Sequence, residues 1–61
     1  MKLDWTITEL MYLTRNELCE LNDRLLKALV DFETGSRERT HALTSLANIR
    51  CVIRLRNDLR L

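Results

Sequence analysis

The sequence predicts an all-α fold: an antiparallel helical hairpin of two long helices with a short N-terminal helix docked on it, in one domain covering residues 1–61. Gly35 is the only glycine in a chain without proline, and it separates two long segments whose apolar residues recur at steps of three and four. Glycine readily adopts the left-handed conformation that ends a helix, and Ser36 can cap the next helix. Two capping-box patterns predict where the first two helices begin.

The short helix is expected over about residues 7–13. Thr6-Ile7-Thr8-Glu9 matches a capping box, in which the threonine hydroxyl and the glutamate each satisfy a free backbone amide. A helix this short is not stable alone, so it must dock on the rest of the chain. Trp5 is expected to pack in the core.

The first long helix is expected over residues 15–33. Thr14-Arg15-Asn16-Glu17 forms a second capping box. One face carries the apolar stripe Leu18, Leu21, Leu25, Ala28, Leu29 and Phe32. A second stripe lies about 100° further round and exceeds what one partner helix can cover; it comprises Cys19, Leu26 and Val30.

The last helix is expected over residues 37–57. Its main seam comprises Ala42, Leu46, Ile49 and Ile53, and a further apolar arc on the far side comprises Cys51, Val52, Leu55 and Leu59. The short helix ends at Thr14, beside the open end of the hairpin. Leu26 and Val30 lie nearer the turn, so we expect them to stay uncovered.

The charge is divided along the chain. Residues 1–34 carry four Lys/Arg and seven Asp/Glu, giving −3, whereas residues 35–61 carry six Arg and two acids, giving +4. In a hairpin these halves lie side by side, which favours charge complementarity between the helices. No apolar run reaches the roughly 18 residues of a membrane span, so we expect a cytoplasmic protein that binds no membrane. Cys19 and Cys51 are expected to be reduced and packed as small apolar side chains.

Catalytic chemistry finds little support. The one histidine, His41, has no cysteine or acid at ligand spacing, and no glycine-rich loop is present. We therefore expect no enzyme activity, no cofactor, and no catalytic or metal site.

Four arginines near the C-terminus raise the alternative of a nucleic-acid-binding helical-hairpin dimer, packed as a four-helix bundle. Arg50 and Arg54 share one side of the helix, while Arg56 and Arg60 share another. A divided patch on a chain of net charge +1 argues against phosphate binding. A purely self-assembling homo-oligomer is the third possibility.

Two blocks of the sequence resemble a known family. The pattern L-D-W-T-x-T-E-L-M-x-L-T-R-x-E-L-C, from Leu3 to Cys19, is similar to the start of QseM-type small antiactivators, which are encoded on conjugative elements of rhizobia and related bacteria. The block G-S-x-x-R-x-x-A-L-x-S-L-x-N-I-R, from Gly35 to Arg50, is similar to that family's turn and last helix. The stretch from Arg54 to Leu59 does not follow the family pattern.

The resemblance implies a non-enzymatic inhibitor that binds transcriptional activators directly, a quorum-sensing regulator and an excision activator, and so represses transfer of the mobile element. From the residues left off the main seam, we predict a partner-binding surface with apolar positions and rim charges. It comprises Leu26, Val30, Arg54, Leu55, Arg56 and Leu59.

Overall fold

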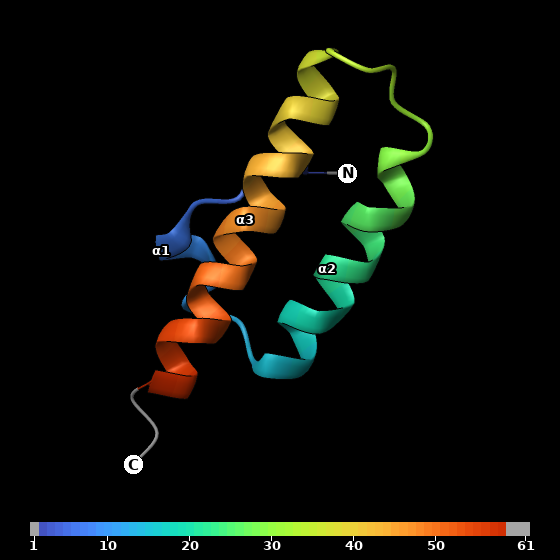
Figure 1. Cartoon of the computed structure of the whole chain (residues 1–61). Coiled ribbons are helices and arrows are strands. Elements are labelled where there is room, and N and C mark those ends of the chain that lie inside the picture. The colour runs from blue at the N-terminus through green and yellow to red at the C-terminus, as the bar shows by residue number, and fades with distance from the viewer. Residues whose placement is uncertain (1, 59–61) are drawn as a thin grey trace.

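The computed structural model describes residues 2–58, and this part of the chain is built from three helices without a strand. They are α1 (Ile7–Leu10), α2 (Arg15–Leu29) and α3 (Arg37–Asp58). The prediction of an all-helical protein is confirmed for these residues. The molecule is elongated, with extents of 42 × 16 × 15 Å. In Figure 1, α2 and α3 run in opposite directions, while α1 and the segment before it pass behind α3.

Both predicted capping boxes are present. The Thr6 hydroxyl accepts a bond from the Glu9 amide at 3.2 Å, and the Glu9 carboxylate accepts one from the Thr6 amide at 3.0 Å. Thr14 and Glu17 repeat the arrangement at 3.2 and 2.9 Å. Each box satisfies two backbone amides that have no partner inside their helix, which is why the helices begin at these residues.

The first two helices end earlier than predicted. α1 stops at Leu10 rather than near 13, because the Tyr12 and Leu13 amides turn back to carbonyls three residues earlier in the chain. α2 stops at Leu29 rather than near 33. The Asp31 and Phe32 amides likewise donate to carbonyls three residues earlier, those of Ala28 and Leu29. The Arg39 guanidinium donates to the Leu29 carbonyl at 3.0 Å, placing a cation at the negative end of α2.

Residues 30–36 therefore form a longer connection than predicted. Gly35 has φ = 84°, the left-handed conformation expected of it, although it precedes α3 instead of closing α2 directly. The Ser36 hydroxyl accepts from the Arg39 amide at 3.2 Å, so the predicted cap of α3 is confirmed.

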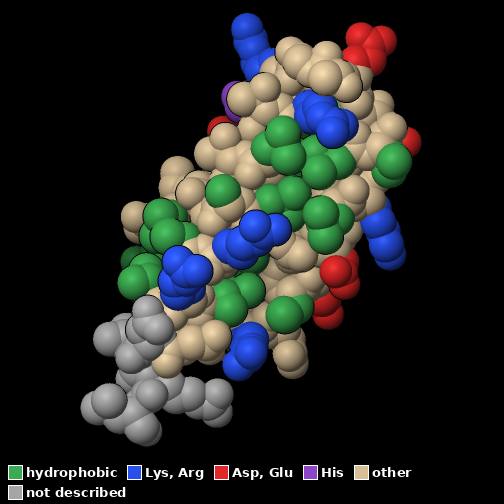
Figure 2. All heavy atoms as spheres, in the orientation of Figure 1, with side chains coloured by type: hydrophobic (Ala, Val, Ile, Leu, Met, Phe, Trp, Pro, Cys, Tyr) green, Lys and Arg blue, Asp and Glu red, His purple; other side chains and the backbone are tan. Residues whose placement is uncertain are grey.

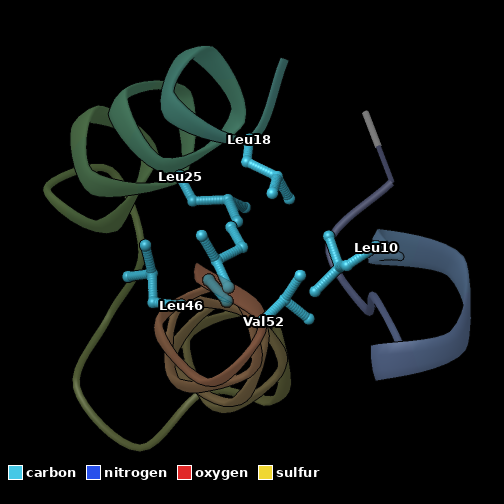
Figure 3. Close-up of a cluster of buried hydrophobic side chains, with 7 residues drawn as sticks. Leu10, Leu18, Leu25, Leu46 and Val52 are labelled. Atoms are coloured by element: carbon cyan, nitrogen blue, oxygen red, sulfur yellow. The ribbon is translucent and has the colours of Figure 1, made fainter. Parts of the chain in front are cut away.

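The core lies where α3 meets both other helices. Seven apolar side chains are buried there and are drawn in Figure 3: Leu10, Leu18, Leu25, Ala42, Leu46, Ile49 and Val52. Looking down α3, α2 lies on one side and α1 on another, and Leu10 and Val52 point toward one another. Val52 was expected on the outer arc of α3. It is fully buried instead, because α1 covers that side of the helix.

The cysteines also differ from expectation. Cys19 and Cys51 are exposed free thiols, not packed apolar side chains. Among residues 2–58, no helix has the length and apolar character needed to cross a membrane.

Candidate functional site: an open groove between α2 and α3

An apolar groove runs between α2 and α3. Its walls are formed from α2 by Cys19, Asn22, Asp23 and Leu26, and from α3 by Leu46, Ile49, Arg50 and Ile53. The groove encloses about 270 Å³, slightly less than the roughly 300–1,000 Å³ of typical small-molecule sites. The groove is open to the outside along its length (Figure 2), so groups from another molecule can reach the side chains that line it.

The groove is open because the N-terminal segment covers the opposite side of α3. The Trp5 amide donates to Ser45 Oγ at 2.7 Å, and the Ser45 hydroxyl donates to the Leu3 carbonyl at 2.5 Å. Asn48 Nδ2 donates to the Trp5 carbonyl at 2.8 Å. These three bonds hold the segment along one side of α3. Leu46 lies on the side of the core away from α1, toward the groove (Figure 3).

The anchoring role of Ser45 and Asn48 was not predicted from the sequence. The available signal was a serine among the buried positions of α3, where apolar residues are the rule. Ser45 is fully buried, and such a hydroxyl needs hydrogen-bond partners. The sequence did not show that those partners are backbone groups some 40 residues away.

Exposed apolar side chains extend the groove toward the α2–α3 connection. Leu26, which lines the groove from α2, is 50% exposed, and Leu43, about one turn before the groove residue Leu46 on α3, is 48% exposed. Val30, one turn beyond Leu26, is 84% exposed. Figure 2 shows hydrophobic side chains gathered over this face between the two helices. The prediction that Leu26 and Val30 stay uncovered is confirmed.

The two edges of the groove differ in charge. Arg50 lines the groove from α3, and Arg54 follows one turn later beside a shallow depression that also includes Arg50 and Cys51. Asp23 lines the groove from α2. Figure 2 shows Lys and Arg side chains over α3 on this face, and both acidic and basic side chains on the outer side of α2. Within residues 2–58, the only ion pair joins Lys2 to Glu9, so Asp23 and Arg50 are not paired with each other.

Three of the residues predicted to bind a partner fall on this face: Leu26, Val30 and Arg54. Leu55 is 43% exposed, but it follows Leu46 by nine residues, or two and a half turns, and so lies on the opposite side of α3.

The other two predicted residues are placed differently. The Arg56 guanidinium donates to the carbonyls of Met11 and Leu13, at 2.9 and 2.5 Å, and so holds the α1–α2 connection against α3. Leu59 lies outside the described residues. The predicted set is therefore not brought together as one patch.

Two carboxyls of the described chain, Glu9 and Glu17, are held in the helix caps. Hydrogen bonds from Lys2 and the Thr6 amide lower the pKa of Glu9, and the Thr14 amide lowers the pKa of Glu17. Both carboxyls belong to helix caps, outside the groove. Residues 2–58 contain no cluster of three His, Cys, Asp or Glu side chains suited to a metal ion, and His41 is exposed.

Comparison with known proteins gives no further guide to the site: no family model, curated protein or solved structure matches the chain.

Proposed function

We propose that this chain is a non-enzymatic antiactivator, which binds a transcriptional activator by protein–protein contact through the groove between α2 and α3. The proposal rests on the observation that only one side of the contact between α2 and α3 is covered by the rest of the chain. The N-terminal segment covers one side of the α2–α3 contact, while exposed Leu26 and Leu43 border the other. Contiguous exposed apolar surface of this kind typically marks a binding site for another protein.

An amphipathic helix of the activator is the segment that fits this groove best. Its apolar face lies along Leu26 and Leu46, as in other helix-in-groove complexes. Acidic side chains on one of its edges approach Arg50 and Arg54, which favours rapid association and fixes the orientation. A helix held in this way is withheld from the contacts that it makes during activation.

The class of activator in this proposal is inferred from the family resemblance. The blocks from Leu3 to Cys19 and from Gly35 to Arg50 resemble QseM-type antiactivators. The proposed partners are accordingly a quorum-sensing regulator and an excision activator, and the proposed outcome is repression of mobile-element transfer. In this proposal the protein acts in the cytoplasm.

Nucleic-acid binding has one observation in its favour, the adjacent exposed arginines Arg50 and Arg54. Arg56, however, is bound to two backbone carbonyls. Salt separates the two functions. Binding to phosphates weakens steeply as salt rises, whereas an apolar protein interface changes little.

Two matched leucine variants test the proposal. Leu26→Asp places a charge in the groove, and Leu55→Asp places one at similar exposure on the opposite side of α3. Each variant is purified, checked for helix content by circular dichroism, and titrated with the host's purified quorum-sensing activator. We expect Leu26→Asp to weaken binding by about 2 kcal/mol or more, roughly 30-fold, and to relieve repression in a reporter assay. Leu55→Asp should bind nearly as the unchanged chain does.

Weaker binding by Leu55→Asp, with normal binding by Leu26→Asp, would place the interface on the side of α3 opposite the groove. Normal binding by both folded variants would remove the groove from the mechanism, and no binding of the unchanged chain to the activator would refute the proposed function.

A further inference from the structure

We propose that the groove face also pairs with a second copy of this chain, in a symmetric dimer in which each α2 lies over the α3 of the other copy. The observation behind this is the unequal charge of the two groove edges. Asp23 lines the groove from α2 and Arg50 from α3, and they form no ion pair within the chain. Each edge therefore offers a charge that complements the opposite edge of an identical molecule.

Symmetry decides how two such faces meet. One possible two-fold axis lies between the two faces and runs parallel to the helices. It places α2 of one copy over α3 of the other, and every residue keeps its position along the helix direction. Asp23 and Arg50 line the same groove and thus lie at a similar height, so each Asp23 meets the other copy's Arg50. The contact is made twice, because residues exchange roles across a two-fold axis.

The other two-fold axis within the face runs across the helices. It places α3 over α3 in reverse direction, which brings the Arg50 and Arg54 side chains of both copies to one edge. Like charges at an interface suppress association. The parallel axis is therefore the arrangement that the charges allow.

The apolar part of the groove supplies the attraction. Leu26, Leu46 and Ile53 line it, and Leu43 continues it by one turn. In the dimer these side chains face the same set of the second copy, and the two hairpins together form a four-helix arrangement. A 61-residue chain has a small core of its own, and association is one of the ways in which such chains gain stability.

Self-pairing uses the face proposed above for the activator. Dimerisation and activator binding then exclude each other, so that the monomer is the binding form and the fraction of active inhibitor falls as its own concentration rises. Only this consequence rests on the proposed function. The dimer itself is tested without any activator.

Charge reversal provides the test. Asp23→Arg and Arg50→Asp each place like charges across the proposed dimer, and sedimentation velocity over a concentration series in low salt measures the dissociation constant. We expect each single variant to dimerise at least tenfold more weakly than the unchanged chain. An equimolar mixture of the two variants should recover a dimer, because Arg at 23 of one then meets Asp at 50 of the other. The double variant should recover it alone.

Glu20→Arg is the matched control. It makes the same charge change on the same helix, but Glu20 lies on the other edge of α2, beside Trp5 and Leu21. It should dimerise as the unchanged chain does, and circular dichroism checks that all variants are folded. A chain that stays monomeric throughout the series overturns the proposal. So does a dimer whose single variants match the control, or one that mixing fails to restore. An unchanged chain that stays monomeric and still binds the activator would refute this inference and leave the proposed function intact.

Discussion

Replacing Ser45 with alanine should detach the N-terminal segment from α3. The Ser45 hydroxyl is fully buried and makes two bonds, accepting from the Trp5 amide and donating to the Leu3 carbonyl. Losing each bond costs about 1 kcal/mol when a partly buried partner is left unpaired. Alanine returns roughly 0.5 kcal/mol, since it favours the helix more than serine does. The expected net loss is about 1.5 kcal/mol, or roughly 6–12 °C in Tm for a domain of this size.

The assay uses the chain's single tryptophan, Trp5, which lies in the segment itself. Urea unfolding is followed by tryptophan fluorescence and by circular dichroism. In the Ser45→Ala variant the fluorescence transition should shift to lower urea further than the loss of helix does, because the segment leaves before α2 and α3 unfold. Thr44→Ala is the control, as it removes a neighbouring exposed hydroxyl. Equal midpoints for Ser45→Ala and Thr44→Ala, by both probes, would refute the reasoning.

Three further predictions concern the turn, a cap and the α1–α2 connection. Gly35→Val should cost about 1–2 kcal/mol through backbone strain alone, because no atom lies within 4 Å of the added Cβ; an unmoved urea midpoint would contradict this. The Thr14 amide holds the pKa of Glu17 below its ordinary 4.5, so this bond stabilises the fold above the unfolded-state pKa and is lost as pH falls through the folded one. In an NMR titration the Glu17 carboxyl should therefore titrate below pH 4.5, and a Glu17 midpoint at 4.5 in the unchanged chain would exclude the bond. Thr14→Ala keeps the backbone amide and removes only the Thr14 hydroxyl, so it should raise the pKa of Glu17 only part of the way toward 4.5. Arg56→Ala should cost about 1–2 kcal/mol by denaturation, since it frees two carbonyls, while exposed Arg54→Ala should change little; equal effects would count against the Arg56 bonds.

Local features of this protein were determined by its sequence. The capping boxes at Thr6 and Thr14, the left-handed Gly35 and the cap at Ser36 each depend on residues within one helical turn. Contacts between residues so close in the sequence do not depend on how the rest of the chain folds. They can therefore be predicted from a few neighbouring residues. The main apolar stripes follow for a similar reason, since the helical period fixes which residues share a face.

Only the tertiary structure decided which of those faces are covered. Val52 is buried because α1 packs on that side of α3, and the carbonyl of Leu29 is capped by Arg39 from the next helix. The groove beside Leu26 is open because Ser45 and Asn48 anchor the N-terminal segment on the opposite side. These contacts join residues up to 43 positions apart. The helical period of the sequence indicates which faces are apolar. Two helices packed together leave part of that apolar surface exposed, however. The period does not indicate which part the N-terminal segment covers, because that depends on contacts between residues far apart in the sequence.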